Sequence, residues 1–405
     1  MQTIYERCCG MDVHKKIIVA CLRIGNKTEL KRFDTLTCSV KDLGNWLLEN
    51  DCQMVAMEST GVYWKPIYNI LELLNLDVMV VNAHHMKSVP GRKTDVKDAE
   101  WIADLLQHGL LKASYIPDKE QRELRDVVRY RKSLIEERAR ELNRLEKILE
   151  GANIKLSSFV SSLTGVSSRR LIEQAIQGEV NNENIDDLIH HSMQSKKAEL
   201  LLAMEGALSN VQKLLVSAIL DHYDDMSRRI IELDNIIDNQ MKKYEDAIQK
   251  IDELPGIGKR SAQTILAEIG LDMSRFPSAA HLTSWTGLCP GNNESAGKRK
   301  NGKTNKGNRH LKTTLIQCAK SAQKDKDSFF HAQYQRLVVR RGKNRATVAV
   351  AHSMLIAIYH MLKENVSFND LGSDYYAKFN SEKKANYYLR KLEELGVSVS
   401  VSYAT

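Results

Sequence analysis

The spacing of apolar residues changes near residue 115 from short extended runs to long helical repeats, and this change most constrains the fold. Strands are predicted at 8–13, 16–24, 30–34, 53–57 and 77–81, and helices at 40–49, 65–74 and 95–106. Gly25-Asn26 is a hairpin turn signal between the second and third strands. Three strands in a meander followed by helix–strand–helix–strand–helix predict a mixed sheet covered by helices, an α/β fold.

Two long helical repeats follow. The first runs from about residue 120 to 153 through Leu134, Leu142, Leu145 and Leu149, and the second through Met226, Ile230, Leu233, Ile237, Tyr244 and Ile248. Both predict long all-α segments with a coiled-coil-like seam. The seams could pair with each other or with another subunit, and we expect a homodimer or homotetramer joined partly by them. The Ser-rich segment 155–200 has no clear pattern. A helix is predicted at 382–395.

Positive charge is concentrated rather than spread along the chain. The formal net charge is +8, yet seven Lys or Arg and no acid fall between Lys298 and Lys312. A second cluster holds Arg336, Arg340, Arg341, Lys343 and Arg345. Such clusters attract polyphosphate and release its counterions, so we expect contact with nucleic acid. A solvated loop is the alternative for either cluster alone.

Cysteines and hydropathy bear on the compartment. The seven cysteines are odd in number and lack Cys-x-x-Cys spacing, which argues against a disulfide framework and a zinc site and favours small core residues. No apolar run approaches the roughly 20 residues of a membrane helix, and residues 1–7 do not resemble a signal peptide. We therefore expect a cytoplasmic protein without membrane contact.

Four acids stand at positions suited to a metal site. Asp12 and Glu58 end the first and fourth predicted strands, and Asp95 and Asp98 open the helix that follows the last strand. Neighbouring strands bring their ends together, and an i, i+3 pair shares one helix face. Four converging carboxylates need a counter-charge, which Mg²⁺ supplies through oxygen ligands. Two such ions about 4 Å apart can hold both oxygens of a phosphodiester displacement.

Each acid also has a simpler interpretation. Asp95 could cap its helix, and Asp98 could be a solvated acid of the first turn. Asp12 and Glu58 are harder to explain in this way, because an acid at the end of an apolar strand is poorly placed for a core. The set of four favours the metal site.

A glycine-containing turn follows the second long repeat, in Leu254-Pro255-Gly256-Ile257-Gly258-Lys259-Arg260. An apolar-Pro-Gly-apolar-Gly pattern before a helix is typical of a helix–hairpin–helix, whose backbone N–H groups can face a phosphate. Such a motif holds duplex DNA without reading its sequence. An ordinary corner between two helices is the alternative.

Ser295 lies in a small polar loop, Asn292-Asn293-Glu294-Ser295-Ala296-Gly297, directly before the densest basic run. A serine in such a loop is a candidate nucleophile. Loop serines are common, so this feature alone is a weak signal.

Together these motifs resemble the DEDD transposases of bacterial insertion sequences, the bridge-RNA-guided recombinases. The resemblance covers about residues 8–365. It rests on Gly10-Met11-Asp12-Val13-His14-Lys15, Glu58-Ser59-Thr60-Gly61-Val62-Tyr63, Lys93-Thr94-Asp95-Val96-Lys97-Asp98-Ala99, Leu254-Pro255-Gly256-Ile257-Gly258 and Lys306-Gly307-Asn308-Arg309-His310-Leu311.

The resemblance implies a RuvC-like ribonuclease H fold over residues 1–115, a long helical, coiled-coil region over 116–250, and a mainly helical transposase domain over 251–365, with 366–405 as a tail. It implies Asp12, Glu58, Asp95 and Asp98 as ligands of Mg²⁺, and Ser295 as the nucleophile that becomes a phosphoserine. The family often has a glycine straight after this serine, where this chain has Ala296. No other serine lies between Trp285 and Lys320.

Partners also follow from the resemblance. It implies donor and target DNA and a non-coding guide RNA, which would carry the sequence information by base pairing. A bacterial cytoplasmic protein associated with the nucleoid is expected. The residues expected to contact nucleic acid are Gly256, Gly258, Lys259, Arg260, Lys298, Arg299, Lys300, Lys303, Lys306, Arg309 and Lys312.

We therefore expect a DNA transposase that cuts and rejoins strands. The alternatives are a hydrolytic, structure-selective nuclease of the junction-resolvase type, which would use the metal site alone, and a scaffold for RNA or DNA that has lost its activity. The four acids argue against the scaffold, and Ser295 with its basic loop favours the transposase over the nuclease.

Overall fold

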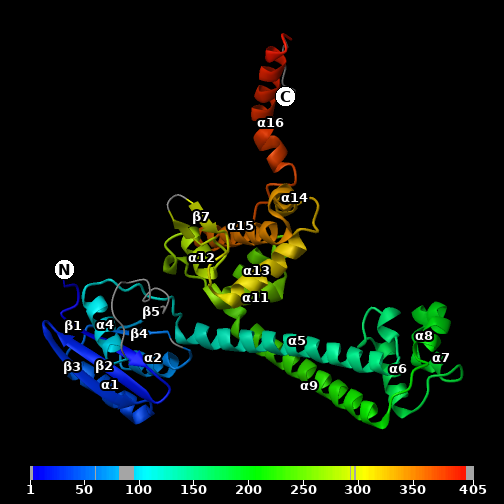
Figure 1. Cartoon of the computed structure of the whole chain (residues 1–405), viewed down its shortest axis with the longest axis horizontal. Coiled ribbons are helices and arrows are strands. Elements are labelled where there is room, and N and C mark those ends of the chain that lie inside the picture. Colours follow the sequence, from blue (N-terminus) through cyan, green and yellow to red (C-terminus); the bar gives the residue numbers. More distant parts are fainter. Residues whose placement is uncertain (1–2, 60, 82–94, 292, 296–297, 398–405) are drawn as a thin grey trace. The chain divides into compact units, whose positions relative to one another are not determined.

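The computed structural model describes residues 3–59, 61–81, 95–291, 293–295 and 298–397. Only the backbone is described at 95–97, 293–295, 298–301, 377 and 379–384. The chain divides into two compact units, Met1–Pro117 and Asp118–Thr405 (Figure 1).

The first unit contains a five-stranded mixed sheet, as expected from the sequence. Its strands are β1 Arg7–Val13, β2 Ile17–Ile24, β3 Lys27–Asp34, β4 Met54–Glu58 and β5 Val78–Val81. The order is β3-β2-β1-β4-β5, with the first three strands antiparallel and β1, β4 and β5 parallel. Gly25 has φ +57° in the predicted hairpin turn, where a glycine accepts the left-handed backbone.

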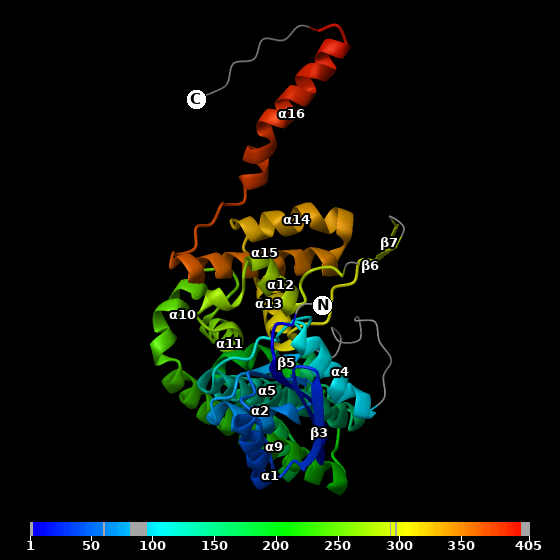
Figure 2. The same ribbon diagram turned by 90° about the vertical axis from the view of Figure 1, so that its left-hand side faces the viewer.

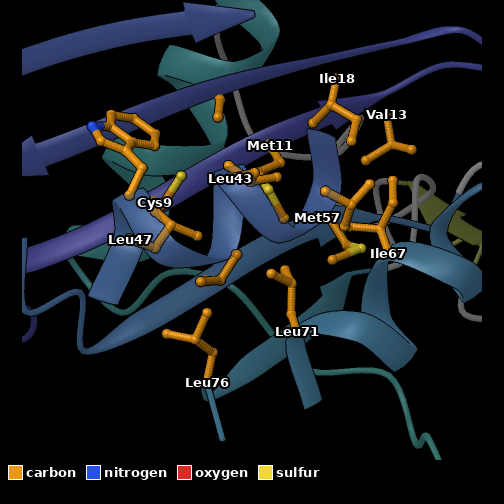
Figure 3. Packing of buried hydrophobic residues seen from close by; sticks show 14 of the residues in the cluster. Cys9, Met11, Val13, Ile18, Leu43, Leu47, Met57, Ile67, Leu71 and Leu76 are labelled. Atoms are coloured by element: carbon orange, nitrogen blue, oxygen red, sulfur yellow. The ribbon is translucent and has the colours of Figure 1, made fainter. Parts of the chain in front are cut away.

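Helices cover both faces of this sheet. On one face, α1 Thr37–Glu49 and α2 Trp64–Leu73 pack over the strands, and Met11, Leu43, Met57 and Leu71 meet in a fully buried core (Figure 3). On the other face, α4 Asp95–Gln107 packs through Ile102, Leu105 and Leu106 on Cys8, Ala56 and Val81. Of the seven cysteines, all free thiols, Cys8, Cys9, Cys21 and Cys318 are buried, in line with a role as small core residues.

Gly10 allows α4 to lie directly on β1. A Cβ atom at Gly10 would come within 2.2 Å of the Ala103 amide nitrogen and 2.5 Å of the Ala99 carbonyl oxygen. Both distances are far below any real Cβ contact, so only glycine fits beneath the helix. The backbone of β1 therefore sets the position of α4.

The second unit begins with an antiparallel pair of long helices, α5 Lys119–Gly151 and α9 Asn210–Gln240 (Figure 1). Leu134 of α5 packs on Met226 and Ile230 of α9, and the Arg131 Nε atom lies 2.5 Å from the Asp234 Oδ1 atom. The seams thus pair with each other within one chain. The predicted second helix was too long: α9 ends at Gln240, and Ile248 belongs to α10 beyond a 3-10 turn, Lys242–Tyr244.

Residues 152–209 form a helical module at the far end of the pair (Figure 1), although the sequence showed no clear pattern over 155–200. Its elements are η1 Leu156–Ser158, α6 Val166–Gln177, α7 Ile185–Leu188, η2 His191–Lys196 and α8 Lys197–Ala203. They share a buried core with α5 and α9, in which Leu171, Ile172 and Leu200 meet Leu145 and Leu220. We call residues 152–209 the tip module.

The remaining elements form a helical domain with one small hairpin. They are α10 Glu245–Asp252, α11 Lys259–Ile269, η4 Met273–Arg275, α12 Ala279–Thr286, β6 Asn293–Ser295, β7 Lys298–Asn301, α13 Arg309–Ala322, α14 Phe329–Arg341, α15 Lys343–Glu364 and α16 Tyr375–Glu394. The predicted C-terminal helix starts at Tyr375, earlier than expected.

Within the described residues, α15 alone has the length and hydropathy of a membrane span, which sequence analysis overlooked. Half of its apolar window is buried, and Val350, Met354 and Ile358 are fully inaccessible to solvent. These contacts are those of a core helix.

Candidate functional site: an acidic sheet edge and a basic hairpin

The first candidate site lies where parallel strands β1 and β4 end. Met11 pairs with Met57 in register, so Asp12 and Glu58 follow at neighbouring positions on adjacent strands. Asp98 lies in the first turn of α4, and Ala99 one residue later packs against Gly10 of β1. The fold therefore brings three of the four predicted acids to one edge of the sheet.

The charges of these acids act on one another. The Asp12 side chain is 15% exposed, and its Oδ2 atom lies 2.9 Å from the Nε2 atom of His14. Burial raises the pKa of Asp12, His14 opposes that shift, and the charges of Asp98 and Glu58 raise the pKa further. Asp12 is thus close enough to both Asp98 and Glu58 for their charges to disfavour its ionised form.

The residues fit a hard divalent cation in donor chemistry and in charge. Asp12, Glu58 and Asp98 offer carboxylate oxygens, the ligands that Mg²⁺ prefers, and a cation would offset their repulsion. Among the residues with described side chains, no three His, Cys, Asp or Glu groups close around a common point. Asp95 opens α4, and its side chain lies outside the described residues.

His14 is a site residue that sequence reasoning missed. It follows β1 directly, and its ring contacts the Asp12 carboxylate rather than a backbone partner. His14 could have been found from its i, i+2 spacing to Asp12, because this spacing places two side chains on one side of an extended segment.

The second candidate site is the hairpin that holds Ser295. Ser295 ends β6 and pairs with Lys298 of β7. Below the hairpin, the amide of Gly291 donates a 3.0 Å bond to the Lys303 carbonyl, and Pro290 bridges to Thr304. Both strands project from the helical domain (Figure 2). The side chains of Ser295, Lys298, Arg299 and Lys300 lie outside the described residues.

The rest of the basic run leads from this hairpin into α13. Lys303, Lys306 and Arg309 are exposed to solvent. The Nζ atom of Lys312 instead donates a 2.7 Å bond to Thr304, and burial lowers the pKa of this lysine. Lys312 therefore braces the base of the hairpin, whereas the side chains of Lys303, Lys306 and Arg309 are exposed on the surface.

The predicted glycine turn joins α10 to α11, as a helix–hairpin–helix would. However, Gly256 has φ +83°, and a Cβ atom there would meet the Ala322 amide nitrogen of α13 at 2.4 Å. Gly256 is therefore explained by packing on α13. A Cβ atom at Gly258 would instead lie 4.0 Å from the Asp252 Oδ1 atom, so this position has room for a side chain.

The two cations of this turn have partners on α9. The Arg260 Nη1 atom lies 2.8 Å from Asp238 Oδ1, and its Nε atom lies 3.3 Å from Asp234. The Lys259 Nζ atom lies 3.7 Å from Asp238, with about half of its side chain exposed. Arg260 thus fastens α11 to α9, and Lys259 is the freer of the two to meet a phosphate.

A buried acid that sequence reasoning also missed supports the basic loop. Glu268 of α11 is almost inaccessible, and it receives two 2.7 Å hydrogen bonds from Arg129 and one of 2.6 Å from the Asn308 side chain. The Asn308 Oδ1 atom caps α13 through the Leu311 amide. Glu268 therefore anchors the segment that links the hairpin to α13. Its signal was an acid between the apolar residues 265–267 and the apolar Ile269.

Comparison with known proteins agrees with this organisation. Residues 9–154 match a DEDD-type transposase model of the IS110 group, and residues 248–335 match the model described as transposase of the IS116/IS110/IS902 family. The first match covers the acidic edge, and the second covers Ser295 and its basic hairpin.

Two curated relatives are similar to most of the chain. One is an uncharacterised 43.6 kDa protein of insertion element IS110 from Streptomyces coelicolor, 25% identical over 309 residues, which are 69% of this chain and 73% of the relative. The other is a putative transposase from Sinorhizobium fredii, 22% identical over 257 residues, with 62% of this chain and 54% of the relative covered. Two IS110-type transposase domains in this order along one chain support its assignment as an insertion-sequence transposase.

Proposed function

We propose that the transposase cuts and rejoins DNA through a phosphoserine formed on Ser295, with divalent metal held by Asp12, Glu58, Asp95 and Asp98. The metal part of the proposal is supported by the placement of Asp12 and Glu58 at neighbouring positions on parallel strands, where Asp12 is close enough to Glu58 and Asp98 for their charges to raise its pKa. A cluster of this kind costs stability unless a cation joins it, which is expected of a functional site rather than a structural one.

In the proposed reaction, the Ser295 hydroxyl oxygen attacks phosphorus and its proton passes to a base or water. The bond from phosphorus to the leaving sugar oxygen breaks, and that oxygen takes up a proton. A strand hydroxyl then attacks the phosphoserine, forms the new phosphodiester and restores the serine. Bound Mg²⁺, two ions in the expected arrangement, would stabilise charge on the phosphate oxygens. Rejoining needs no external energy, because each ester bond is replaced by another.

Hydrolysis is the competing function. If water attacks instead of Ser295, the phosphodiester energy is lost and the protein is a metal-dependent nuclease. The acidic edge supports both reactions equally. The location of Ser295 at the end of a projecting hairpin, directly before a basic run, favours the phosphoserine.

The test is a labelled DNA substrate analysed on a denaturing gel without protease. Wild type is expected to give a slow band of protein joined to DNA, and Ser295→Ala is expected to bind DNA without forming it. Ser284→Ala, an exposed serine of α12, is the matched control and should keep the band. Free cut ends without the band in wild type would establish the nuclease, and a band that persists in Ser295→Ala would move the nucleophile elsewhere.

A non-coding guide RNA is also part of the proposal. The exposed cations Lys303, Lys306 and Arg309 provide a surface that binds nucleic acid by shape and charge, which suffices where base pairing carries the sequence information. Purified protein should retain a discrete RNA encoded beside its gene. Nuclease-sensitive RNA of random sequence would contradict this part of the proposal.

We still expect the protein to form an oligomer, but for a different reason from the helical seams. Because α5 and α9 bury their seams on each other, these seams no longer require a second subunit. Exchange of two duplexes still requires more than one active site, so we expect a dimer or tetramer on DNA. A strict monomer by light scattering of the nucleic acid complex would overturn this expectation.

A further inference from the structure

The corner between α14 and α15 carries the longest acid-free stretch of the helical domain. From Phe329 to Lys363 there is no Asp or Glu, and five of the six Lys or Arg fall within ten residues. These are Arg336, Arg340, Arg341, Lys343 and Arg345, and we call residues 336–345 the α14–α15 corner. The matched transposase segment ends at residue 335, directly before it.

All five cations are exposed. The helices lie along each other (Figure 2), joined by a 2.8 Å bond between Gln333 and Ser353, and the chain reverses at Gly342, with φ +77°. Arg336 lies over the Tyr376 ring at 4.5 Å from its centroid. In the part of the chain that the structure describes, none of the five is within ion-pair distance of a carboxylate.

Folding does not account for this charge. Arg340 and Arg341 end α14, where a helix dipole favours cations. Lys343 and Arg345 stand in the first turn of α15, where the dipole disfavours them, and that turn has neither an acid nor a side-chain cap. The corner thus holds cations at a cost to local stability, which is expected when they serve a ligand.

The chemistry of the corner selects that ligand. Residues 336–345 contain no aromatic side chain, and the neighbouring Tyr376 ring is already packed against Arg336 and Phe329, so the corner favours phosphates over the stacked bases of a single strand. The four exposed cations beside Gly342 are Arg340, Arg341, Lys343 and Arg345. They suit the phosphates of a duplex, because Arg can bind a phosphate through two parallel hydrogen bonds. We propose that the α14–α15 corner binds the phosphate backbone of the DNA duplex on which the transposase acts.

This inference rests on the transposase assignment but not on the role of Ser295. The test variant replaces Arg340, Arg341, Lys343 and Arg345 with Gln, and leaves Arg336 on Tyr376. The control replaces four exposed cations of the α5–α9 pair and tip module with Gln, namely Arg140, Lys147, Arg170 and Lys196, and so changes the net charge equally. Circular dichroism and thermal melting establish that both variants fold.

Affinity for a DNA duplex is then measured over a range of salt concentrations. The log–log slope flattens by about 0.9 for every phosphate that the protein no longer neutralises, so four such phosphates predict a change of about 3.6 in the corner variant and none in the control. Equal slopes in wild type and corner variant, or equal flattening in corner and control, would overturn the proposal. Loss of binding to duplex RNA alone would also overturn it. At saturating protein the corner variant should still form the covalent band, which separates this result from a failure of the phosphoserine proposal.

Discussion

The guanidinium of Arg129 donates two hydrogen bonds of 2.7 Å to the two carboxylate oxygens of Glu268, and so ties α5 to α11. The Glu268 side chain is 1% exposed and that of Arg129 is 31% exposed. Arg129→Met leaves a buried carboxylate without its main partner, so we expect a loss of about 3–5 kcal/mol in unfolding free energy. Glu268→Gln should cost less, because Arg129 can reach water.

The double variant tests this asymmetry. With Gln at 268 no buried carboxylate is left to lose its partner, so Arg129→Met should cost much less in that background. Denaturant unfolding of the four proteins gives the coupling directly. Additive losses would show that the pair does not act as a unit.

The same pair predicts a pH dependence. Burial raises the pKa of Glu268, but hydrogen bonds and charge from Arg129 outweigh it, so the pKa is lowered from its ordinary 4.5. Stability from this group is therefore present above pH 4.5 and is lost as pH falls through the lowered pKa. The unfolding free energy of wild type should therefore fall below pH 4.5. Glu268→Gln should lack the part of this fall that comes from Glu268. Thermal melting between about pH 3 and about pH 7 measures both proteins.

Asp12→Asn tests the acidic edge. Without metal, the variant should melt at a higher temperature than wild type, because a neutral amide removes repulsion from Glu58 and Asp98. Saturating Mg²⁺ should stabilise wild type, by about 2.7 kcal/mol at a hundredfold excess over Kd, and should not stabilise the variant. Cleavage should be lost. Asp42→Asn, at an exposed position of α1, should respond to Mg²⁺ as wild type does; the same response in Asp12→Asn would refute the metal assignment.

Two neighbouring glycines separate packing from DNA contact. Gly256→Ala places a methyl group against α13 in a left-handed backbone, so we expect a loss of about 1–3 kcal/mol in unfolding free energy. Gly258→Ala meets open space and should change stability by under about 1 kcal/mol. If the turn holds a phosphate, Gly258→Ala weakens DNA binding without loss of stability. Unchanged affinity in this variant would leave the turn a structural corner.

Neutralising Lys298, Arg299 and Lys300 with Gln should weaken DNA binding. The salt slope should flatten by about 0.9 for each phosphate that these side chains neutralise in wild type. Titrations at several salt concentrations, beside Arg140→Gln/Lys147→Gln/Arg170→Gln as a charge-matched control, measure this change. An unaltered slope would mean that β7 does not touch the backbone of DNA.

The sheet could be predicted from sequence because its information is local. Short apolar runs mark the strands, Gly25 marks the turn between β2 and β3, and an apolar run ending in Asp12 or Glu58 marks a strand end. Which helix packs against another cannot be predicted from the residues of that helix alone. Leu134 shows which face of α5 is buried, but only the folded chain shows that Met226 covers it.

The tip module and the supporting residues escaped prediction for related reasons. The core of the tip depends on Leu145 and Leu220 of the flanking helices, so segment 155–200 alone shows too few apolar residues. Glu268 is bound by Arg129, which lies far from it in the sequence. His14 binds Asp12 across the end of β1, a contact that depends on the backbone course beyond the strand. Gly256 fitted a DNA-binding pattern, although contact with α13 explains it.

The antiparallel course of α5 and α9 brings the two ends of the tip module together. A Cβ atom at Gly206 would touch the Ala152 carbonyl, and the amide of Lys155 bonds to the Ala203 carbonyl, so the module leaves and re-enters the chain at nearly one point. Beyond residue 154 it also falls between the two matched transposase segments, which end at 154 and resume at 248. An insertion in its loops can therefore lengthen the module without separating α5 from α9.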